Sequence, residues 1–181
     1  MEADTAASPV KRLFFALWPA RDTRDAILTV TRPLVRISGG RAVVPENLHA
    51  TLAFLGSVKS DRLSAIIGVA DQIHAAPFAV YLDRLEFWKR PRILALCASR
   101  TPPELLNLVQ NLWRGLETCG FTPEKRPFRA HVTLARKASR MPQTDSGLLV
   151  DWELDQFVLA ESVTDPKGVR YAVLRRWRLG P

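Results

Sequence analysis

HATLA at residues 49–53 and HVTLA at residues 131–135 spell nearly the same five letters in the two halves of a 181-residue chain. The chain contains three histidines, and two of them open these stretches. The longer stretch LHATLAFLG predicts a strand that stops at Gly56, and HVTLAR predicts a second strand. The repeat indicates an internal duplication in which the two strands occupy equivalent places.

The rest of the first half predicts alternating strands and helices. RLFFALWP predicts a strand stopped by Pro19, and the helix that follows is expected to end or kink at Pro33. Ser60 is a plausible cap for a second helix. The expected elements are a strand at 12–19, a helix at 20–37, a strand at 48–56, a helix at 60–76 and an alternating strand at 78–82.

The second half repeats this order. A strand is expected at 92–99, a helix at 102–120, a basic loop at 121–130 and a strand at 131–136. Two alternating segments, 152–159 and 171–177, predict a hairpin across a turn at 165–168. The pattern predicts an α+β or α/β chain, with a flexible leader at 1–10 and one domain over 11–181.

The composition favours an anionic partner. The chain has 26 Lys and Arg against 18 Asp and Glu, a net charge of +8, which suits nucleic acid, a nucleotide or a membrane surface, although arginine-rich usage alone would give the same charge. No apolar run reaches the roughly 20 residues of a membrane span. The opening MEADTAASP lacks the features of a secretory signal. We therefore expect a cytoplasmic protein without a membrane partner.

In a β-strand, the histidine and the threonine of each motif point to the same face. Side chains alternate along a strand, so His49 and Thr51 share one face about 7 Å apart. His131 and Thr133 do the same. Two such strands related by pseudo-symmetry would converge on a cleft and bring two imidazoles and two hydroxyls together.

Two facing histidines suit in-line displacement at phosphorus. The nucleophile and the leaving group lie on opposite sides of the phosphate, so a base and an acid must flank it. A histidine pKa of about 6.5 makes both protonation states available near neutral pH. Threonine hydroxyls and a nearby arginine would stabilise the phosphate oxygens. These residues alone do not say which histidine is the acid.

Other chemistries have weaker support. The chain has no HExxH motif and no acidic cluster beside either motif histidine, and Gly39-Gly40 lacks the lysine and threonine of a P-loop. Cys97 and Cys119 lack CxxC spacing and are expected to be small buried apolar residues. His74 has no threonine partner and is left out of the site. We expect no metal ion and no cofactor.

The paired motifs, together with RLFFALWP and PENLHATLAFLG, resemble the two-histidine (2H) phosphoesterases. The closest resemblance is to the bacterial and archaeal RNA 2′,3′-cyclic phosphodiesterases, also called 2′-5′ RNA ligases, and it extends from Arg12 to the closing YAVLRRWRL. It implies a bilobal α+β fold whose duplicated lobes have antiparallel-rich sheets framing a central groove, with helices outside. It also implies metal-independent hydrolysis of a terminal RNA 2′,3′-cyclic phosphate to a 2′-phosphate.

The resemblance assigns roles that the residues themselves leave open. His49 would be the proton donor to the departing 3′ oxygen, and His131 the proton acceptor that activates water. Thr51 and Thr133 would hold the phosphate oxygens. Arg136 matches an arginine that follows the second motif, but alternation places it opposite Thr133 unless a twist, a bulge or its long side chain brings it back. Ala130 stands where the family often has proline.

Contacts to RNA are expected around the groove. Phe14 or Phe15 would stack on a terminal base, and the other would belong to the core. Arg129 is a candidate, because FWKRPR at 87–92 and KRPFR at 125–129 interleave cations with aromatic rings, as a single-stranded RNA path does. The alternative is that these segments are solvated loops.

Three functions compete. The first is an RNA 2′,3′-cyclic phosphodiesterase, a monomer whose substrates are RNA ends or cyclic-phosphate nucleotides. The second is another activity of the same superfamily: reversible 2′-5′ ligation of RNA, or opening of cyclic nucleotides or ADP-ribose cyclic phosphate. The third is an RNA-binding module without turnover, which has no chemical need for both intact motifs.

Overall fold

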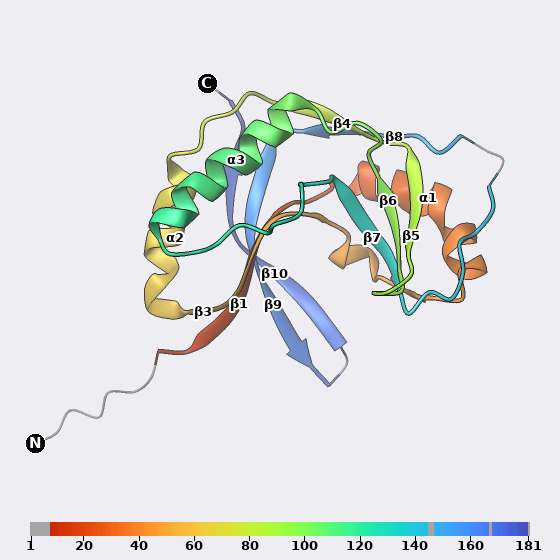
Figure 1. The fold of residues 1–181 in the computed structure, drawn as a ribbon, viewed down its shortest axis with the longest axis horizontal. Coiled ribbons are helices and arrows are strands. Elements are labelled where there is room, and N and C mark those ends of the chain that lie inside the picture. The colour runs from red at the N-terminus through yellow and green to blue at the C-terminus, as the bar shows by residue number, and fades with distance from the viewer. Residues whose placement is uncertain (1–7, 145–146, 167, 181) are drawn as a thin grey trace, which may run out of the picture.

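Each motif strand lies in its own four-stranded sheet of the computed structural model, which describes residues 8–144, 147–166 and 168–180 (Figure 1). All strand pairs are antiparallel. The first sheet has the order β10 (Gly168–Arg178), β9 (Gln156–Asp165), β1 (Val10–Leu17), β3 (Ala50–Lys59). The second has the order β2 (Arg41–Ala42), β7 (His131–Arg136), β6 (Ile93–Cys97), β5 (Arg84–Trp88), and β4 (Phe78–Leu82) pairs separately with β8 (Val150–Leu154).

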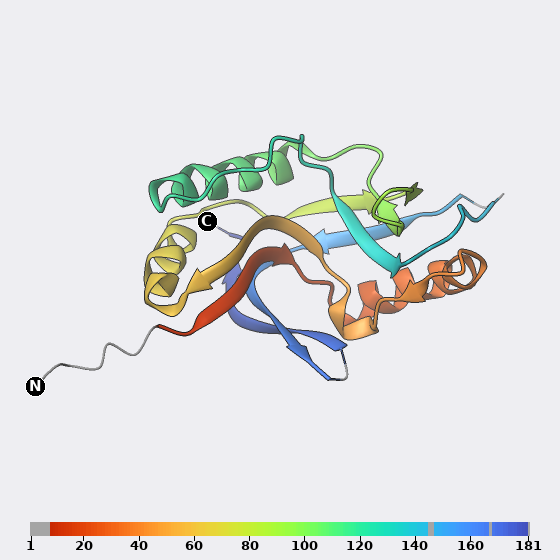
Figure 2. The ribbon, with the colours of Figure 1, turned by 60° about the horizontal axis from the view of Figure 1, so that its bottom comes forward.

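Three α-helices flank the sheets (Figure 2). They are α1 (Arg21–Ile37), α2 (Leu63–Asp71) and α3 (Pro103–Thr118), with short 3-10 turns at Pro45–Asn47 and Ser60–Arg62. Helix α1 follows β1, yet it contacts β2, β7 and β8. Helix α3 follows β6, yet it contacts β3 and α2. Each of these two helices therefore packs against strands from the other half of the chain.

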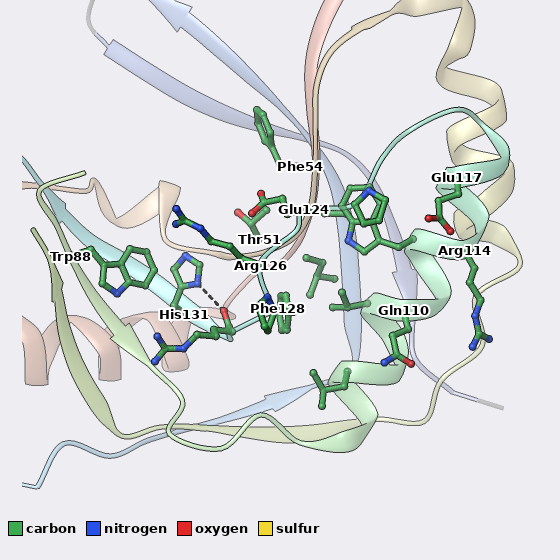
Figure 3. A pocket seen from close by; sticks show the side chains of 18 residues that line it. Thr51, Phe54, Trp88, Gln110, Arg114, Glu117, Glu124, Arg126, Phe128 and His131 are labelled. Carbon is green, nitrogen blue, oxygen red and sulfur yellow. Dashed lines mark hydrogen bonds between the residues drawn. The ribbon is translucent and has the colours of Figure 1, made fainter. Parts of the chain in front are cut away.

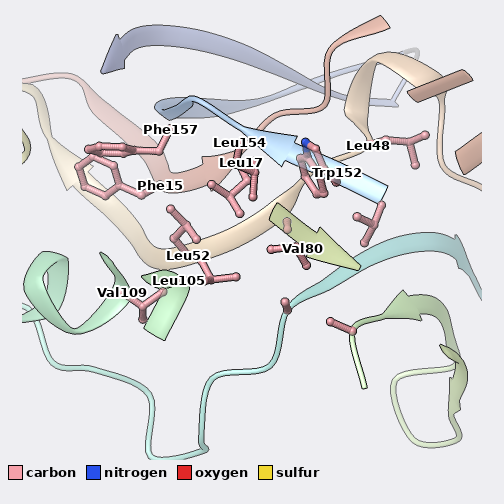
Figure 4. Packing of buried hydrophobic residues seen from close by; sticks show 14 of the residues in the cluster. Phe15, Leu17, Leu48, Leu52, Val80, Leu105, Val109, Trp152, Leu154 and Phe157 are labelled. Atoms are coloured by element: carbon pink, nitrogen blue, oxygen red, sulfur yellow. The ribbon is translucent and has the colours of Figure 1, made fainter. Parts of the chain in front are cut away.

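One buried cluster joins the two sheets. Leu17 and Leu52 from the first sheet share it with Leu94 and Val132 from the second (Figure 4 shows part of it). Trp152 on β8 is among the largest fully buried side chains. A smaller cluster on the other face of β1 contains Phe14 and Ala16 with residues of β9. The α+β architecture with antiparallel sheets and flanking helices agrees with the prediction.

Several predicted boundaries are wrong. The expected strand 152–159 is two strands, because the chain bends at Asp155, whose carbonyl accepts a hydrogen bond from the Leu179 N–H at 2.7 Å. The turn at 165–168 does join β9 to β10. Residues 84–88 form β5, which was not predicted. Of the predicted leader at 1–10, residues 1–7 lie outside the described residues, and the Pro9 carbonyl accepts hydrogen bonds from Ser60.

Two helices also differ from the prediction. Helix α1 continues through Pro33 to Ile37, because Pro33 lies on its exposed side while Ile27 and Leu34 hold its buried side. The helix expected at 60–76 begins as a 3-10 turn and ends at Asp71. The Ser60 hydroxyl does not cap it and instead donates to the Pro9 carbonyl. None of the helices that the structure describes is long and apolar enough to span a membrane.

Candidate active site

The backbone holds the two motif histidines in the same way. Nδ1 of His49 lies 2.7 Å from the carbonyl oxygen of Asn47, and Nδ1 of His131 lies 2.8 Å from that of Arg129. Because a carbonyl oxygen can only accept, Nδ1 of each ring carries a proton and donates it. Nε2 is therefore the nitrogen of each imidazole that is left for proton transfer.

The motif threonines place hydroxyl groups beside these rings. Oγ1 of Thr51 lies 3.1 Å from Nε2 of His49, and the hydroxyl donates because Nε2 of a neutral ring only accepts. Thr133 occupies the equivalent position on β7, where it pairs with Ala95 of β6. Both threonines are half-buried, and Thr51 lines the groove.

A β-bulge distorts both motif strands at the same leucine. The register of β1 with β3 leaves Leu52 without a partner, and the register of β6 with β7 leaves Leu134 without one. Each leucine directly follows its motif threonine. An unpaired residue reverses the alternation of every side chain that follows it. Residues 53–54 of β3, up to a second unpaired residue at Leu55, and residues 135–136 of β7 therefore face the side opposite to the one that regular alternation predicts.

The bulge brings Arg136 to the face of β7 that carries His131 and Thr133. The residues of β6 that pair with these three lie two positions apart from one another, so they point to one face of β6. The three residues of β7 therefore also share one face. Of the three ways in which Arg136 was expected to reach this face, the bulge at Leu134 is the one that the strand register shows. The Arg136 charge also contributes to lowering the pKa of His49, so the guanidinium acts across the site.

The equivalent position on β3 is Phe54. Thr51 and Phe54 pair with Ala16 and Phe14, which share a face of β1, so both lie on the face that carries the motif. Phe54 is 40% exposed. Strand alternation alone would have turned this ring away from the site.

Aromatic rings surround His49. Trp18 stacks on its imidazole with ring centroids 5.5 Å apart, and Phe14 and Tyr171 each lie 5.0 Å away. Desolvation by burial, followed by the charges of His131 and Arg136, lowers the pKa of His49 from 6.5 to about 4, against the opposing effect of the hydrogen bond to Asn47. His49 is therefore neutral at pH 7 when the site holds no anion.

His131 has a different environment. It is half-buried, and Trp88 packs edge-on against it at 4.8 Å. Nε1 of Trp88 donates to Glu86 at 2.9 Å, and the other oxygen of Glu86 pairs with Arg129, whose carbonyl holds His131. One carboxylate thus links the ring beside His131 to the residue that orients it.

Comparison with known proteins identifies the family. The model of the LigT-like phosphoesterases matches residues 17–95 and 97–171, so each matched segment contains one motif. The chain belongs to the LigT-like phosphoesterase family.

Two curated relatives match this LigT-like phosphoesterase over nearly their whole length. An Escherichia coli protein named RNA 2′,3′-cyclic phosphodiesterase is 32% identical over 95% of this chain and 98% of its own. An Archaeoglobus fulgidus protein of the same name is 29% identical over 91% of this chain and 98% of its own. The crystal structure of E. coli LigT complexed with 3′-AMP superposes with a TM-score of 0.87 at 31% identity, covering 96% of this chain and 100% of that one.

A groove of about 1180 Å³ opens beside the motifs of this LigT-like phosphoesterase. Thr51 and His131 line one end, and α3 lines the other (Figure 3). Arg126, from the loop that precedes β7, points toward Thr51 and His131. Of the two predicted basic segments, 125–129 contributes four residues to the lining and 87–92 contributes only Trp88.

Of the three residues expected to contact RNA, only one lies at the groove with an exposed side chain. Phe15 is fully buried in the main core, so it makes no contact with a base. Phe14 lies on the site face, as alternation allowed, but it is 3% exposed and packs against His49, so it supports the imidazole and does not offer a stacking surface. Arg129 lies at the groove, engaged with Glu86.

The LigT-like site includes residues that the sequence did not indicate. Asn47, Trp18 and Tyr171 hold or enclose His49, and Phe54 reaches the groove only through the bulge. Tyr171 comes from β10, whose place beside the motif depends on tertiary structure. The Asn47 contact could have been found from spacing alone, because the backbone carbonyl two positions before a motif histidine lies within reach of Nδ1, as that of Arg129 does for His131. Cys97 is buried as expected, whereas Cys119 is half-buried.

Proposed function

We propose that this chain hydrolyses a terminal RNA 2′,3′-cyclic phosphate to a 2′-phosphomonoester, with His49 and His131 as acid and base and without a metal ion. The observation that carries the proposal is the pair of equivalent histidines, each fixed through Nδ1 and each beside a motif threonine. The relatives named RNA 2′,3′-cyclic phosphodiesterase support the choice of substrate.

The reaction follows from these groups. Nε2 of His131 accepts a proton from water, and the water oxygen bonds to phosphorus. The bond to the 3′ oxygen breaks, and that oxygen takes a proton from Nε2 of His49. Thr51, Thr133 and Arg136 hold the non-bridging oxygens, whose charge grows in the transition state.

His49 needs a second proton before it can act as the donor. Its pKa of about 4 leaves Nε2 unprotonated in the free protein at neutral pH. A bound phosphate anion favours the charged imidazolium and raises that pKa. We therefore propose that Nε2 of His49 becomes protonated when the substrate binds, and that it later donates this proton. If the roles were reversed, His131 would supply the proton and the 2′ oxygen would leave.

The decisive assay uses an oligoribonucleotide that ends in a 2′,3′-cyclic phosphate, in the presence of a chelator. We expect a 2′-phosphate product, and loss of turnover in both His49→Ala and His131→Ala. A 3′-phosphate product would reverse the leaving-group assignment. Turnover that survives either substitution, or that the chelator abolishes, would overturn the mechanism.

The competing activities share the site and differ in substrate. Cyclic mononucleotides and ADP-ribose 1″,2″-cyclic phosphate in the same assay distinguish them, and RNA halves with 2′,3′-cyclic phosphate and 5′-hydroxyl ends test for ligation, in which the 5′-hydroxyl replaces water and the 3′ oxygen leaves. Binding of RNA without turnover of any of these substrates would favour a non-catalytic module. We further propose that the enzyme works in the cytoplasm as a monomer of one bilobal unit; size-exclusion chromatography with light scattering tests the oligomeric state.

A further inference from the structure

Phe54 is an exposed aromatic ring that the catalytic pair does not use. It belongs to neither buried cluster, although its strand neighbours Leu52 and Ala53 are buried. Its side chain is 40% exposed and lines the groove that Thr51 and His131 enter. The fold thus holds a large apolar ring in contact with water on the catalytic face.

A neighbouring arginine supports this ring. The guanidinium of Arg12 lies over the Phe54 ring, 4.9 Å from its centroid. The attraction between a cation and the ring below it restrains the orientation of the ring. Phe54 pairs with Phe14, two residues along β1 from the partner of Thr51, which places it roughly 7 Å farther along the strand, beyond the terminal ribose that the histidines flank.

The groove continues from Phe54 to α3. Arg126 lines the part near the histidines and Arg114 the part on α3. Glu117 and Glu124 also line the groove, so its charge alone does not select RNA. Proteins that bind single-stranded RNA do, however, combine an exposed aromatic ring with cations along a groove, as this groove does beside its phosphate site.

We propose that this groove binds the nucleotides on the 5′ side of the cyclic phosphate, and that Phe54 stacks on the base next to the terminal one. The inference rests on the proposed function and adds to it that oligoribonucleotides are preferred over mononucleotides. Arg114 contacts a backbone phosphate farther along the chain. The terminal nucleotide itself does not reach Phe54.

The test compares the binding of two products by calorimetry, so that it does not depend on turnover. The ligands are adenosine 2′-phosphate and a tri-adenylate that ends in a 2′-phosphate. We expect the trimer to bind about tenfold more tightly. Phe54→Ala should remove this advantage and leave binding of the mononucleotide unchanged, whereas Phe54→Trp should keep it.

Tyr81→Ala is the matched control, because Tyr81 is a 54% exposed aromatic residue on β4 that does not line the groove. It should leave both affinities unchanged. Equal affinities of the wild type for the two ligands, or a trimer advantage that survives Phe54→Ala, would overturn the inference. A loss of both affinities in Phe54→Ala with a normal melting temperature would assign Phe54 to the terminal nucleotide instead. If the trimer binds through Phe54 but no cyclic phosphate is hydrolysed, the inference stands and the proposed function fails.

The dependence on salt gives an independent readout. Each phosphate contact to a single strand adds about −0.7 to the slope of log affinity against log salt concentration. Arg114→Gln should flatten the slope for the trimer by about this amount and leave that for the mononucleotide unchanged. Arg100→Gln, at another exposed arginine outside the groove, should change neither slope. An unchanged trimer slope in Arg114→Gln would remove Arg114 from the RNA path.

Discussion

Asn47 ties His49 to the edge strand β10. Its carbonyl oxygen accepts the 2.7 Å hydrogen bond from Nδ1 of His49, and its side-chain amide bonds the backbone of Val169 at 2.7 Å and of Tyr171 at 3.2 Å. The side chain is buried and occupies the edge of β10 that β9 leaves unpaired. Asn47 therefore positions both the His49 ring and Tyr171, which packs against that ring.

Asn47→Ala should lower the free energy of unfolding by about 1 kcal/mol, because two backbone groups of β10 lose their partner in a partly buried setting. Urea denaturation measures this loss. The variant should also lower kcat more than it raises KM, since it loosens His49 without touching the substrate. Thr164→Ala, on the exposed part of neighbouring β9, is the control and should leave kcat unchanged. An unchanged kcat in Asn47→Ala would show that Asn47 serves stability alone.

The low pKa of His49 can be measured directly. NMR titration of the free protein should give a pKa of about 4 for this ring. Arg136→Gln should raise the value, because a positive charge that disfavours the imidazolium is removed. Addition of a 2′-nucleotide should raise it as well. A free-protein value near 6.5 would contradict the buried environment described for His49.

The same shift predicts how stability depends on pH. The unfolded chain protonates His49 near pH 6.5 and the folded protein only near pH 4, so the unfolded state binds more protons between these values. Stability from this group is complete above about pH 6.5 and is lost as the pH falls toward 4. Urea denaturation should therefore show a steeper decline over this window in the wild type than in His49→Gln.

Arg136→Gln should lower kcat/KM by about 100-fold, since a guanidinium that stabilises charge on the phosphate oxygens is lost. Lys137→Gln is the control, because Lys137 is the neighbouring exposed cation and follows the last residue of β7. Steady-state kinetics on a cyclic mononucleotide compares the two variants. Equal effects in both would mean that general charge, and not the position of Arg136 on the motif face, matters.

Glu86→Gln should weaken the ion pair with Arg129 and loosen Trp88 against His131. We expect a loss of activity of a few-fold, with a larger change in kcat than in KM, because Glu86 does not touch the substrate. Tryptophan fluorescence would report the change around Trp88. Glu153→Gln, at an exposed carboxylate on β8, should change neither readout.

The sequence predicted the parts of the site that depend on local spacing. Alternation along a strand correctly paired each motif histidine with its threonine, and it separated Phe14 from Phe15. It failed beyond Thr51 and Thr133, because a bulge depends on how a strand pairs with its neighbour and has no local signature in an apolar stretch.

Long-range packing accounts for the other misses. Tyr171 and Asn47 are far apart in the chain, and only the position of β10 beside the residues that precede β3 brings them together. The break at Asp155 was missed because β8 alternates buried and exposed residues, and one bent residue before β9 leaves that pattern almost unchanged.

Helices α1 and α3 each pack against strands from the other half of the chain, and this makes the activity depend on the folding of both halves together. Neither half of the chain, cut near residue 100, would keep the helix that covers its own motif strand. A partly folded molecule that presents one histidine without the other is therefore disfavoured, and the acid and the base form in the same cooperative step. Unfolding of either half would therefore abolish the activity completely. It would not leave a protein that binds RNA ends without hydrolysing them.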